Sequence, residues 1–545
     1  MYNWSILNQK PLKLNRTHTP FQVLGYTFIC LILAIACQSP NKVKTLKERP
    51  NILYIMSDDH AAHAITAYGG IYDDYLQTPN IDRIAKEGVK FNNVFCTNAI
   101  CGPSRAAILT GKYSHANGYY KNESGGKFNA DQWTFPQALQ ESGYKTALVG
   151  KWHLGTEPRG FDYFKYHNNQ GQQGFYYNPV YNDNGEQVTE EGYATNLTAD
   201  FAMDWLNGNK DGEEPFLMML QFKAPHRNWD PDEKYKDLFG NQALPYPPTF
   251  NDDYKSRLKT AGDTDMTMDY LNRRDMKLTP PEGLSDKEKG QWLRAGNQRG
   301  QEEGWLPNDS MSVDEARRWK YQRYIKDYLA CVKSVDDNIG RVLQYLDDNG
   351  LAENTVVVYT SDQGFYLGDH GWFDKRFMYE ESLRMPFVLR YPAFAEKQFD
   401  NNDIISNVDF APTLLDLAGV PIPEDIHGKS FAQNIAGNTS EDWQKTMYYH
   451  YYEFPFWHHV QPHYGIRGQR YKLIHFYYDI DVWEFYDLEK DPNELNNAID
   501  DATYTSVISD MKLEIQQRQK DYGDDGTLDE FREITDTDFG NISGE

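Results

Sequence analysis

Short runs of apolar residues recur along the chain, and polar residues follow most of them. The runs cover residues 51–56, 145–149, 216–222, 355–359 and 387–390. Each run has the length of a β-strand and is apolar at almost every position, which is typical of parallel strands buried on both faces. Because the carboxyl ends of parallel strands meet at one edge of a sheet, the polar residues there are candidates for function.

Helices are predicted between these runs by their start and stop residues. Thr or Pro begins, and Gly ends, the helices predicted over 78–88 and 134–143, and a third is expected over 412–419. Apolar residues three or four positions apart over 313–350 predict one long amphipathic helix or two consecutive ones. The alternation of strands and helices predicts an α/β fold, with a large mixed, mostly parallel sheet sandwiched by helices.

Three other segments have a different character. Residues 251–312 are polar and rich in Gly and Pro, so they form either a surface excursion or a lid beside the active site. Short strand patterns and one helical pattern over 441–522 predict a smaller C-terminal α+β domain that carries a short antiparallel sheet. An acidic tail is expected over 523–545, which leaves residues 51–440 as the main domain.

The first 36 residues have the pattern of an export signal. Positive residues precede an apolar run over 23–36 that is too short to span a bilayer comfortably. The run ends before Cys37, which predicts a bacterial lipoprotein signal, lipidation of Cys37 and a polar tether over 37–50. An ordinary secretory signal is the alternative. We expect a lipid-anchored protein of the bacterial cell envelope, on the periplasmic face or the outer-membrane surface, and the tether's lack of an acidic run favours the periplasm.

Composition limits the partners. The 545 residues contain 55 basic and 80 acidic side chains, a formal charge of −25, which argues against nucleic acid and against any membrane contact other than the lipid anchor. A polyanionic substrate would need a locally positive pocket. Three of the five cysteines lie outside the signal region, too few for a disulfide scaffold, although one bridge is possible.

The segment from Cys101 to Arg105 reads Cys-Gly-Pro-Ser-Arg and continues to Leu-Thr-Gly. Pro103 suits the first turn of a helix, which would place Cys101 at a helix N-terminus. The free N–H groups and the dipole favour an anion there, and Arg105 adds a permanent positive charge. The alternative is a capped helix in a core that happens to contain a thiol, but this reading leaves the Cys-x-Pro-Ser-Arg spacing unexplained.

Two further groups of polar residues lie at predicted strand ends. Lys151 and His153 alternate with Trp152, so an extended chain presents an ammonium and an imidazole on the same side. Asp58-Asp59 and Asp362-Gln363 each follow a strand, and three carboxylates with one amide suit calcium or magnesium. Either group could also be merely solvated.

Together these segments resemble the signatures of the type I, formylglycine-dependent sulfatases of the alkaline phosphatase superfamily. The resemblance spans about residues 51–419, and the strand at Tyr471 looks like the family's C-terminal domain. It implies a hydrolase that removes sulfate from a sulfated polysaccharide or oligosaccharide. It also implies that a formylglycine-generating enzyme, or an anaerobic maturation enzyme, converts Cys101 to formylglycine, whose hydrate supplies the attacking hydroxyl.

The resemblance assigns roles to individual residues. It implies a site for Ca²⁺, less readily Mg²⁺, with these ligands: Asp58, Asp59, Cys101, Asp362 and Gln363. The family commonly has Asn where this chain has Gln363, which makes that ligand the least secure. The remaining catalytic residues that it implies are Arg105, Lys151, His153, His226 in Ala-Pro-His, and Lys375 in Lys-Arg-Phe-Met-Tyr-Glu.

The substrate is less clear from the sequence. Residues 448–467 are dense in aromatics and histidines, which form either a sugar-stacking surface or a buried strand cluster. Candidate substrate contacts are His60, His63, His463 and Arg467. Host glycosaminoglycans and algal polysaccharides such as ulvan both fit, and the acidic, Tyr- and Asn-rich composition favours an algal glycan. The alternatives are a phosphonate or phosphate ester hydrolase of the same superfamily and an inactive glycan-binding lipoprotein.

Overall fold

A ten-stranded mixed sheet forms the centre of the computed structural model, which describes residues 49–294, 306–307, 310–395 and 398–540. Five adjacent strands in the middle, β8 to β4, are parallel. From edge to edge the strands are β12 (Phe399–Ser406), β2 (Val89–Phe95), β11 (Arg384–Arg390), β8 (Thr355–Ser361), β1 (Asn51–Ser57), β7 (Phe216–Phe222), β3 (Lys145–Gly150), β4 (Tyr163–His167), β5 (Val180–Asp183) and β6 (Glu186–Thr189).

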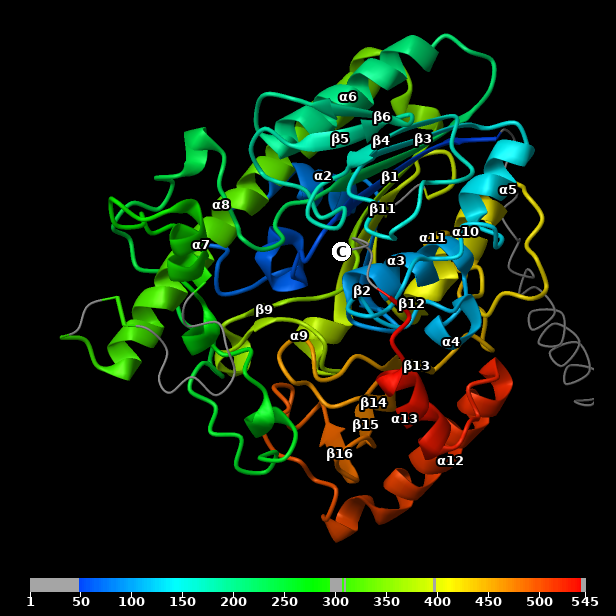
Figure 1. Ribbon diagram of the computed structural model, residues 1–545. Helices are drawn as coiled ribbons and strands as arrows, with labels where there is room; N and C mark the ends of the chain where they lie inside the picture. The colour runs from blue at the N-terminus through cyan, green and yellow to red at the C-terminus, as the bar shows by residue number, and fades with distance from the viewer. Residues whose placement is uncertain (1–48, 295–305, 308–309, 396–397, 541–545) are drawn as a thin grey trace, which may run out of the picture. The chain divides into compact units, whose positions relative to one another are not determined.

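Helices cover both faces of this sheet (Figure 1). One layer contains α2 (Pro79–Lys86), α6 (Ala194–Asn209) and α8 (Val313–Asp348), and the other contains α3 (Cys101–Thr110), α5 (Phe135–Glu141) and α10 (Phe410–Leu417). Alternate residues of β1 enter the two separate cores, with Tyr54 on one side and Ile55 on the other. The predicted α/β sandwich with a mostly parallel sheet is confirmed.

The periodic segment 313–350 forms one helix rather than two. Helix α8 has 36 residues and begins at a capping box in which Ser312 and Glu315 satisfy each other's backbone N–H groups. Gly340 allows close packing on α2, because a Cβ there would lie 2.5 Å from Oδ1 of Asn80. Buried residues of α8 share one core with alternate residues of β1 and β8 and with β7, which are central strands of the sheet.

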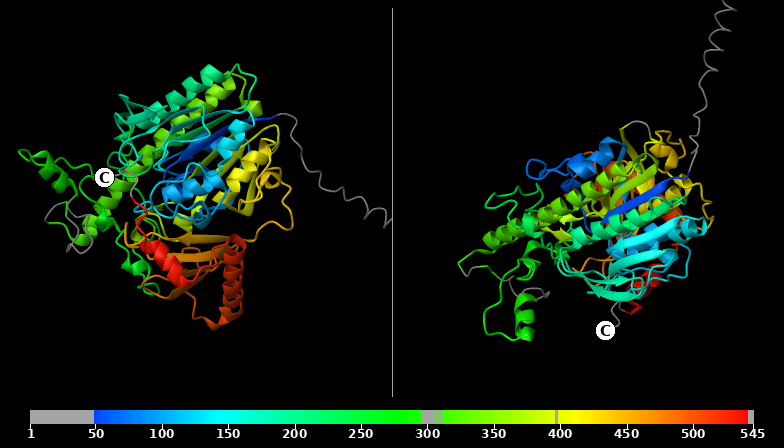
Figure 2. Two further views of the ribbon diagram at one scale, coloured as in Figure 1. Left: turned by 45° about the vertical axis from the view of Figure 1, so that its right-hand side comes forward. Right: turned by 90° about the horizontal axis from the view of Figure 1, so that it is seen from above.

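The C-terminal part forms a second, smaller sheet, as predicted. Its four antiparallel strands are β13 (Thr446–Tyr451), β14 (His463–Gly468), β15 (Tyr471–Phe476) and β16 (Val482–Asp487), with α12 (Thr505–Tyr522) beside them (Figure 2). The stretch expected to be an acidic tail instead contains helix α13 (Leu528–Asp536), which starts at a Thr527–Glu530 capping box and buries Phe531.

The polar insertion 251–312 is partly built into the core. Met266, Met268 and Met276 are fully buried, although most of this segment is irregular apart from α7 (Asp286–Arg294). Burial of a few apolar side chains therefore anchors a segment that lacks helical periodicity. Residues 251–294 are thus more than a surface excursion.

The predicted signal peptide, Cys37 and nearly all of the tether lie outside the described residues. Within the described part, no helix is both long enough and apolar enough to cross a membrane. The three cysteines there, Cys96, Cys101 and Cys331, are all buried and unbridged.

Candidate active site

Two acidic strand ends meet at the centre of the sheet. Strands β1 and β8 are parallel neighbours in register up to their last residues, so the residues that follow them lie side by side. The N–H of Asp59 donates to Oδ1 of Asp362 at 3.1 Å. One carboxylate oxygen from each of Asp58, Asp59 and Asp362 lies within 4.8 Å of the other two. Gln363 is fully buried beside them, and its Nε2 donates to Oδ1 of Asp59.

These residues fit a divalent cation. Oδ1 of Asp58 and Oε1 of Gln363 are buried and have no hydrogen-bond partner among the described residues. Burial raises the pKa of Asp59, an effect that Lys375 opposes and that the charges of Asp58 and Asp362 reinforce. A hard cation such as Ca²⁺ or Mg²⁺ binds oxygen ligands, and its charge would stabilise the ionised form of these buried carboxyl groups.

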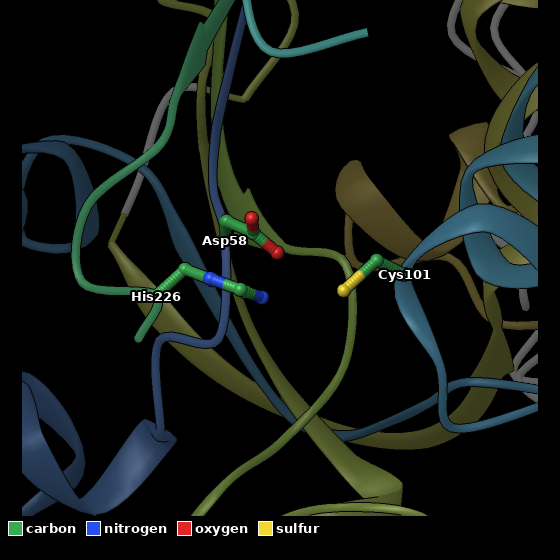
Figure 3. Close-up of side chains that lie close together, drawn as sticks. All are labelled: Asp58, Cys101 and His226. Carbon is green, nitrogen blue, oxygen red and sulfur yellow. The ribbon is translucent and has the colours of Figure 1, made fainter. Parts of the chain in front are cut away.

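Cys101 faces this acidic cluster from the other side. It is the first residue of α3, and its Sγ lies 4.0 Å from Oδ1 of Asp59. Figure 3 shows the side chains of Asp58, His226 and Cys101 converging on a common space. Burial and the charge of Asp58 raise the pKa of the Cys101 thiol well above its usual range. An unmodified thiol at this position therefore stays protonated and is a poor nucleophile.

Arg105 lies on the first turns of the same helix and is almost fully buried. Its Nε donates to Oδ2 of Asp362 at 3.0 Å, and its Nη1 donates to the backbone oxygen of Lys151 at 2.9 Å. The guanidinium thus joins α3 to the ends of two strands. Arg105 is not among the residues that line the cavity, and its hydrogen bonds hold these parts together from behind the site.

Two lysines complete the charge balance. Nζ of Lys375 lies 2.6 and 2.8 Å from the two carboxylate oxygens of Asp59. The ammonium of Lys151 pairs with Asp58 and also donates to Gln173 at 2.7 Å. With Arg105, three cationic side chains match the three carboxylates of the cluster. A bound divalent cation would leave this region positive, which favours an anionic ester inside an acidic protein.

Two histidines present imidazole groups to the same space. Nδ1 of His226 is 2.8 Å from the carbonyl oxygen of Arg227, which leaves Nε2, 3.7 Å from Oδ2 of Asp59, directed at the pocket. Nδ1 of His153 is buried without a hydrogen-bond partner among the described residues. Burial and the neighbouring Lys151 hold the pKa of both histidines well below the usual range, so both rings are neutral in the structure.

A cavity of about 540 Å³ brings these groups together. It is lined by five of the residues predicted from the sequence: Asp59, Cys101, His153, His226 and Lys375. It is also lined by residues that the sequence analysis missed, above all Arg227, Asp374, Arg376, Trp457 and His458. Three of these residues are sequence neighbours of His226 or Lys375, and the other two lie in the aromatic-rich segment 448–467. Their positions in the sequence therefore gave a weak indication that they belong to the site.

His60 and His63 are not among the residues that line this cavity. His60 is fully buried, and its ring bonds to the hydroxyl of Tyr359 beneath the end of the sheet. Nε2 of His63 lies 3.2 Å from Asp369. His60 and His63 are close to Asp59 in the sequence but do not reach the cavity, because the backbone turns at Asp59, which has a φ of 63°.

His463 and Arg467 also lie away from the cavity lining. His463 is fully buried in β14, where its Nε2 accepts from the N–H of Met378 at 3.1 Å. Arg467 pairs with Glu380 at 3.0 Å. Both residues therefore stabilise the small sheet and its contact with the segment after Lys375, and the structure supports no substrate contact for them.

Comparison with known proteins identifies the family. The sulfatase family profile matches residues 50–420, about two thirds of the chain. The chain belongs to the sulfatase family. A second profile, for the C-terminal part of N-sulphoglucosamine sulphohydrolase, matches residues 368–521. The expectation of a sulfatase is thereby confirmed.

This sulfatase has a similar relative over nearly its whole length. It is 44% identical to an N-acetylglucosamine-6-O-sulfatase of Bacteroides thetaiotaomicron, over 96% of this chain and 94% of that protein. A solved structure of a protein in complex with its substrate, D-glucosamine-2-N,6-O-disulfate, matches with a TM-score of 0.80 and 44% identity, over 88% of this chain and 99% of that one. An ulvan-active sulfatase of Formosa agariphila is 25% identical over 91% of this chain and 87% of that protein.

Proposed function

We propose that this sulfatase removes the 6-O-sulfate group from glucosamine units, N-acetylated or N-sulfated, of a glycosaminoglycan-type oligosaccharide. The observation that carries this proposal is the 44% identity, over nearly the whole chain, to a sulfatase named for that position. The algal glycan that composition favoured has weaker support, because the ulvan-active relative is only 25% identical.

The proposed nucleophile is residue 101 after conversion of Cys101 to formylglycine, with Sγ marking where its oxygens would lie. Support comes from the suppressed ionisation of the thiol and from its place at the N-terminus of α3. The hydrated aldehyde would supply one hydroxyl to attack sulfur, with its proton passing to a carboxylate of the acidic cluster, whose Asp59 Oδ1 lies 4.0 Å from Sγ. It would also supply a second hydroxyl whose deprotonation releases sulfate. The proposed cation, Ca²⁺ by its oxygen donors, would stabilise the negative charge on a sulfate oxygen and lower the pKa of the attacking hydroxyl.

The chain's own groups supply the remaining steps. Lys375 and Lys151 offset the charge that spreads over the sulfuryl oxygens during transfer. The Nδ1–H of His226 donates to the carbonyl oxygen of Arg227, so Nε2 of the neutral ring faces the pocket without a proton. When the anionic sulfate ester binds, Nε2 takes up a proton from water, and the imidazolium passes it to the departing sugar oxygen. His153 accepts the proton of the second hydroxyl through its unpaired Nδ1.

The outer part of the pocket is suited to a sugar. Arg376 and Asp374 flank Lys375 and line the cavity, with Arg376 buried and the Asp374 side chain 13% exposed. Their polar groups can therefore bind sugar hydroxyls away from most of the bulk water. Arg227 is held by Asp275 of the insertion, with Nε at 2.8 Å from Oδ1 and Nη2 at 2.6 Å from Oδ2. The insertion therefore supports one wall of the pocket.

The test uses protein expressed with a maturation enzyme, after mass spectrometry has shown an aldehyde at position 101. Sulfate release is measured on N-acetylglucosamine-6-sulfate, glucosamine-2-N,6-O-disulfate, sulfated ulvan oligosaccharides and a matched phosphate ester. We expect release from carbon 6 of both amino sugars, with the N-sulfate retained. Faster cleavage of ulvan or phosphate ester would reject the proposed substrate, and no turnover despite the aldehyde would favour a binding protein.

Export and lipidation at Cys37 belong to the same proposal and rest on the sequence pattern alone. Metabolic labelling with a fatty-acid analogue tests this. Wild-type protein should carry label and fractionate with membranes, whereas Cys37→Ala should carry none.

A further inference from the structure

A loop between α4 (Ser114–Asn117) and α5 connects the helix of Cys101 to the substrate pocket. Asn122 and Glu123 of this loop line the cavity. The side-chain oxygen of Asn122 also accepts from the N–H of Gly102 at 3.1 Å, in the first turn of α3. The position of residues 121–126 therefore affects both the cavity wall and the N-terminus of the helix that begins with Cys101.

One buried carboxylate joins this loop to the opposite wall. Oε2 of Glu453 accepts from the N–H groups of Asn122 and Glu123 at 2.7 and 2.9 Å. Its Oε1 accepts from Nη1 of Arg376 at 2.6 Å. Glu453 is only 1% exposed, so both contacts lie away from water, where charge-assisted hydrogen bonds are strong. Movement of the loop would therefore disturb Arg376.

The other side of the loop is held by the end of the chain. Nζ of Lys121 donates to the carbonyl oxygens of Thr535 and Thr537 at 2.8 and 2.6 Å, at the C-terminus of α13. The N–H of Phe539 donates to the oxygen of Ser124 at 2.7 Å, and a second backbone bond joins Gly126 to Gly540. Figure 1 shows the segment after α13 running from the small sheet back toward α3.

The Lys121 contact is costly to break. The side chain is 2% exposed, and burial lowers its pKa, so its ammonium depends on the carbonyl oxygens that surround it. A lysine is also favoured beside the C-terminal carbonyls of a helix. Loss of the ammonium would leave the carbonyl oxygens of Thr535 and Thr537 without this donor, and the segment would shift to hydrate them.

We infer that residues 534–540 form a clamp that fixes the loop 121–126 in place. Lys121 and Glu453 are the positioning residues that link this clamp to the active site. Lys121 fixes the loop so that Asn122 supports the first turn of α3, and Glu453 orients Arg376 for the sugar. The part that concerns Arg376 rests on the proposed sugar substrate, whereas the part that concerns α3 rests only on sulfatase activity.

Three variants test this with two substrates, the 6-sulfated amino sugar and 4-nitrophenyl sulfate. Lys121→Met should lower kcat on both by about 10- to 100-fold, because a small displacement of the nucleophile has effects of that size. Lys121→Arg keeps a donor for the carbonyls and should restore most of the activity. Lys112→Met, which removes a lysine whose ammonium pairs with the exposed Asp425, is the matched control and should behave as wild type.

Glu453→Gln should raise KM for the amino sugar by about tenfold and leave 4-nitrophenyl sulfate within about threefold of wild type, because only the sugar uses Arg376. Equal losses on both substrates would indicate a purely structural role and overturn the inference for Glu453. Wild-type kinetics in folded Lys121→Met would overturn it for the clamp. If the wild-type protein cleaves 4-nitrophenyl sulfate but not the 6-sulfated amino sugar, the proposed substrate is rejected. The test of Lys121 with the aryl sulfate then remains valid.

Hydrogen exchange of the wild-type protein gives an independent check that needs no variant. If the clamp holds the loop, the N–H groups of Asn122, Glu123, Gly126 and Phe539 should open together and exchange with similar free energies. Exchange at Phe539 that is faster than at the loop amides by more than about 100-fold would show that the chain end opens alone, which contradicts the clamp.

Discussion

Arg105 and Asp362 lie 257 positions apart, yet the Nε of one donates to Oδ2 of the other at 3.0 Å in a fully buried contact. This pair fixes the helix that begins with Cys101 against the strand end that carries the acidic cluster. The distance between the proposed nucleophile and the proposed cation is therefore set by rigid elements rather than by a loop, which is what a preorganised site requires.

Substitution of Cys101 should abolish turnover without unfolding the protein. We expect Cys101→Ala to lose activity by about 10⁴-fold or more, as removal of a nucleophile does in other hydrolases. Cys101→Ser should be nearly as inactive, because serine provides one hydroxyl and the proposed mechanism uses two. Steady-state sulfate release and circular dichroism measure both properties.

Cys96 provides the matched control for that experiment. It is buried five residues away, its thiol donates to backbone oxygens of the segment before β11, and it does not line the cavity. Cys96→Ala should keep turnover within about threefold at a small cost in stability. Full activity of folded Cys101→Ala, or an equal loss in Cys96→Ala, would contradict the assigned nucleophile.

Gln363 should contribute to cation binding although the family commonly has Asn there. Its buried, unpaired Oε1 beside three carboxylates is the reason. We expect Gln363→Ala to weaken Ca²⁺ binding by about 10- to 100-fold, the range found when groups around a bound metal are removed. The rise in Tm with added Ca²⁺ measures this without relying on turnover.

For that titration Gln187→Ala, on the exposed β5–β6 hairpin, is the control and should titrate as wild type. Chelation should lower the Tm of the wild-type protein, because the buried carboxylates would then lose their counter-ion. An unchanged Ca²⁺ midpoint in Gln363→Ala would remove this residue from the ligand set.

Sequence patterns predicted the strand ends well for a physical reason. Continuous apolar runs locate buried parallel strands. Because β1 and β8 are parallel and in register, Asp58 and Asp362 lie side by side independently of the loops that connect the strands. Lys151 and His226 follow from the same argument, because β3 and β7 are the next strands along the sheet. These parts of the site depend on local pattern and sheet geometry alone.

Side chains on irregular segments could not be placed in this way. His458 and His463 lie in the same aromatic-rich segment, but β14 directs His463 into the core, while His458 lies in a loop at the cavity with a φ of 68°. Such loop conformations depend on distant partners, such as Asp374 at 3.3 Å from the His458 ring. No local pattern contains that information, and the clamp by the chain end was hidden for the same reason.

Removal of His226 should affect substrates according to their leaving groups. A sugar alkoxide needs a proton as it departs and nitrophenolate does not, so His226→Gln should slow the amino-sugar sulfate by about 10²- to 10⁴-fold and 4-nitrophenyl sulfate by far less. His63→Gln is the control, since His63 pairs with Asp369 outside the cavity, and it should affect both substrates little. Equal losses on the two substrates in His226→Gln would contradict the role of a general acid.

His370, which is not among the residues that line the cavity, should make stability depend on pH. Burial opposes its protonation, but Nδ1 lies 2.8 Å from Asp252 and Nε2 lies 3.7 Å from Glu381, and these carboxylates outweigh burial and the nearby Arg257 to raise its pKa to about 9. The unfolded value is about 6.5. Because the folded pKa is the higher one, the stabilisation is fully present below about pH 6.5 and is lost as the pH rises through about 9.

The variant His370→Asn isolates this effect. Asn tolerates the φ of 55° at this position, and the lost ring packing costs the same at every pH. With excess Ca²⁺ present, the variant should be less stable than wild type at pH 6, and the gap should shrink by about 3 kcal/mol at most toward pH 9.5. Chemical denaturation of both proteins across this range measures the gap. A constant gap would mean that His370 is neutral in the folded protein and that Asp252 is balanced by Arg257 alone.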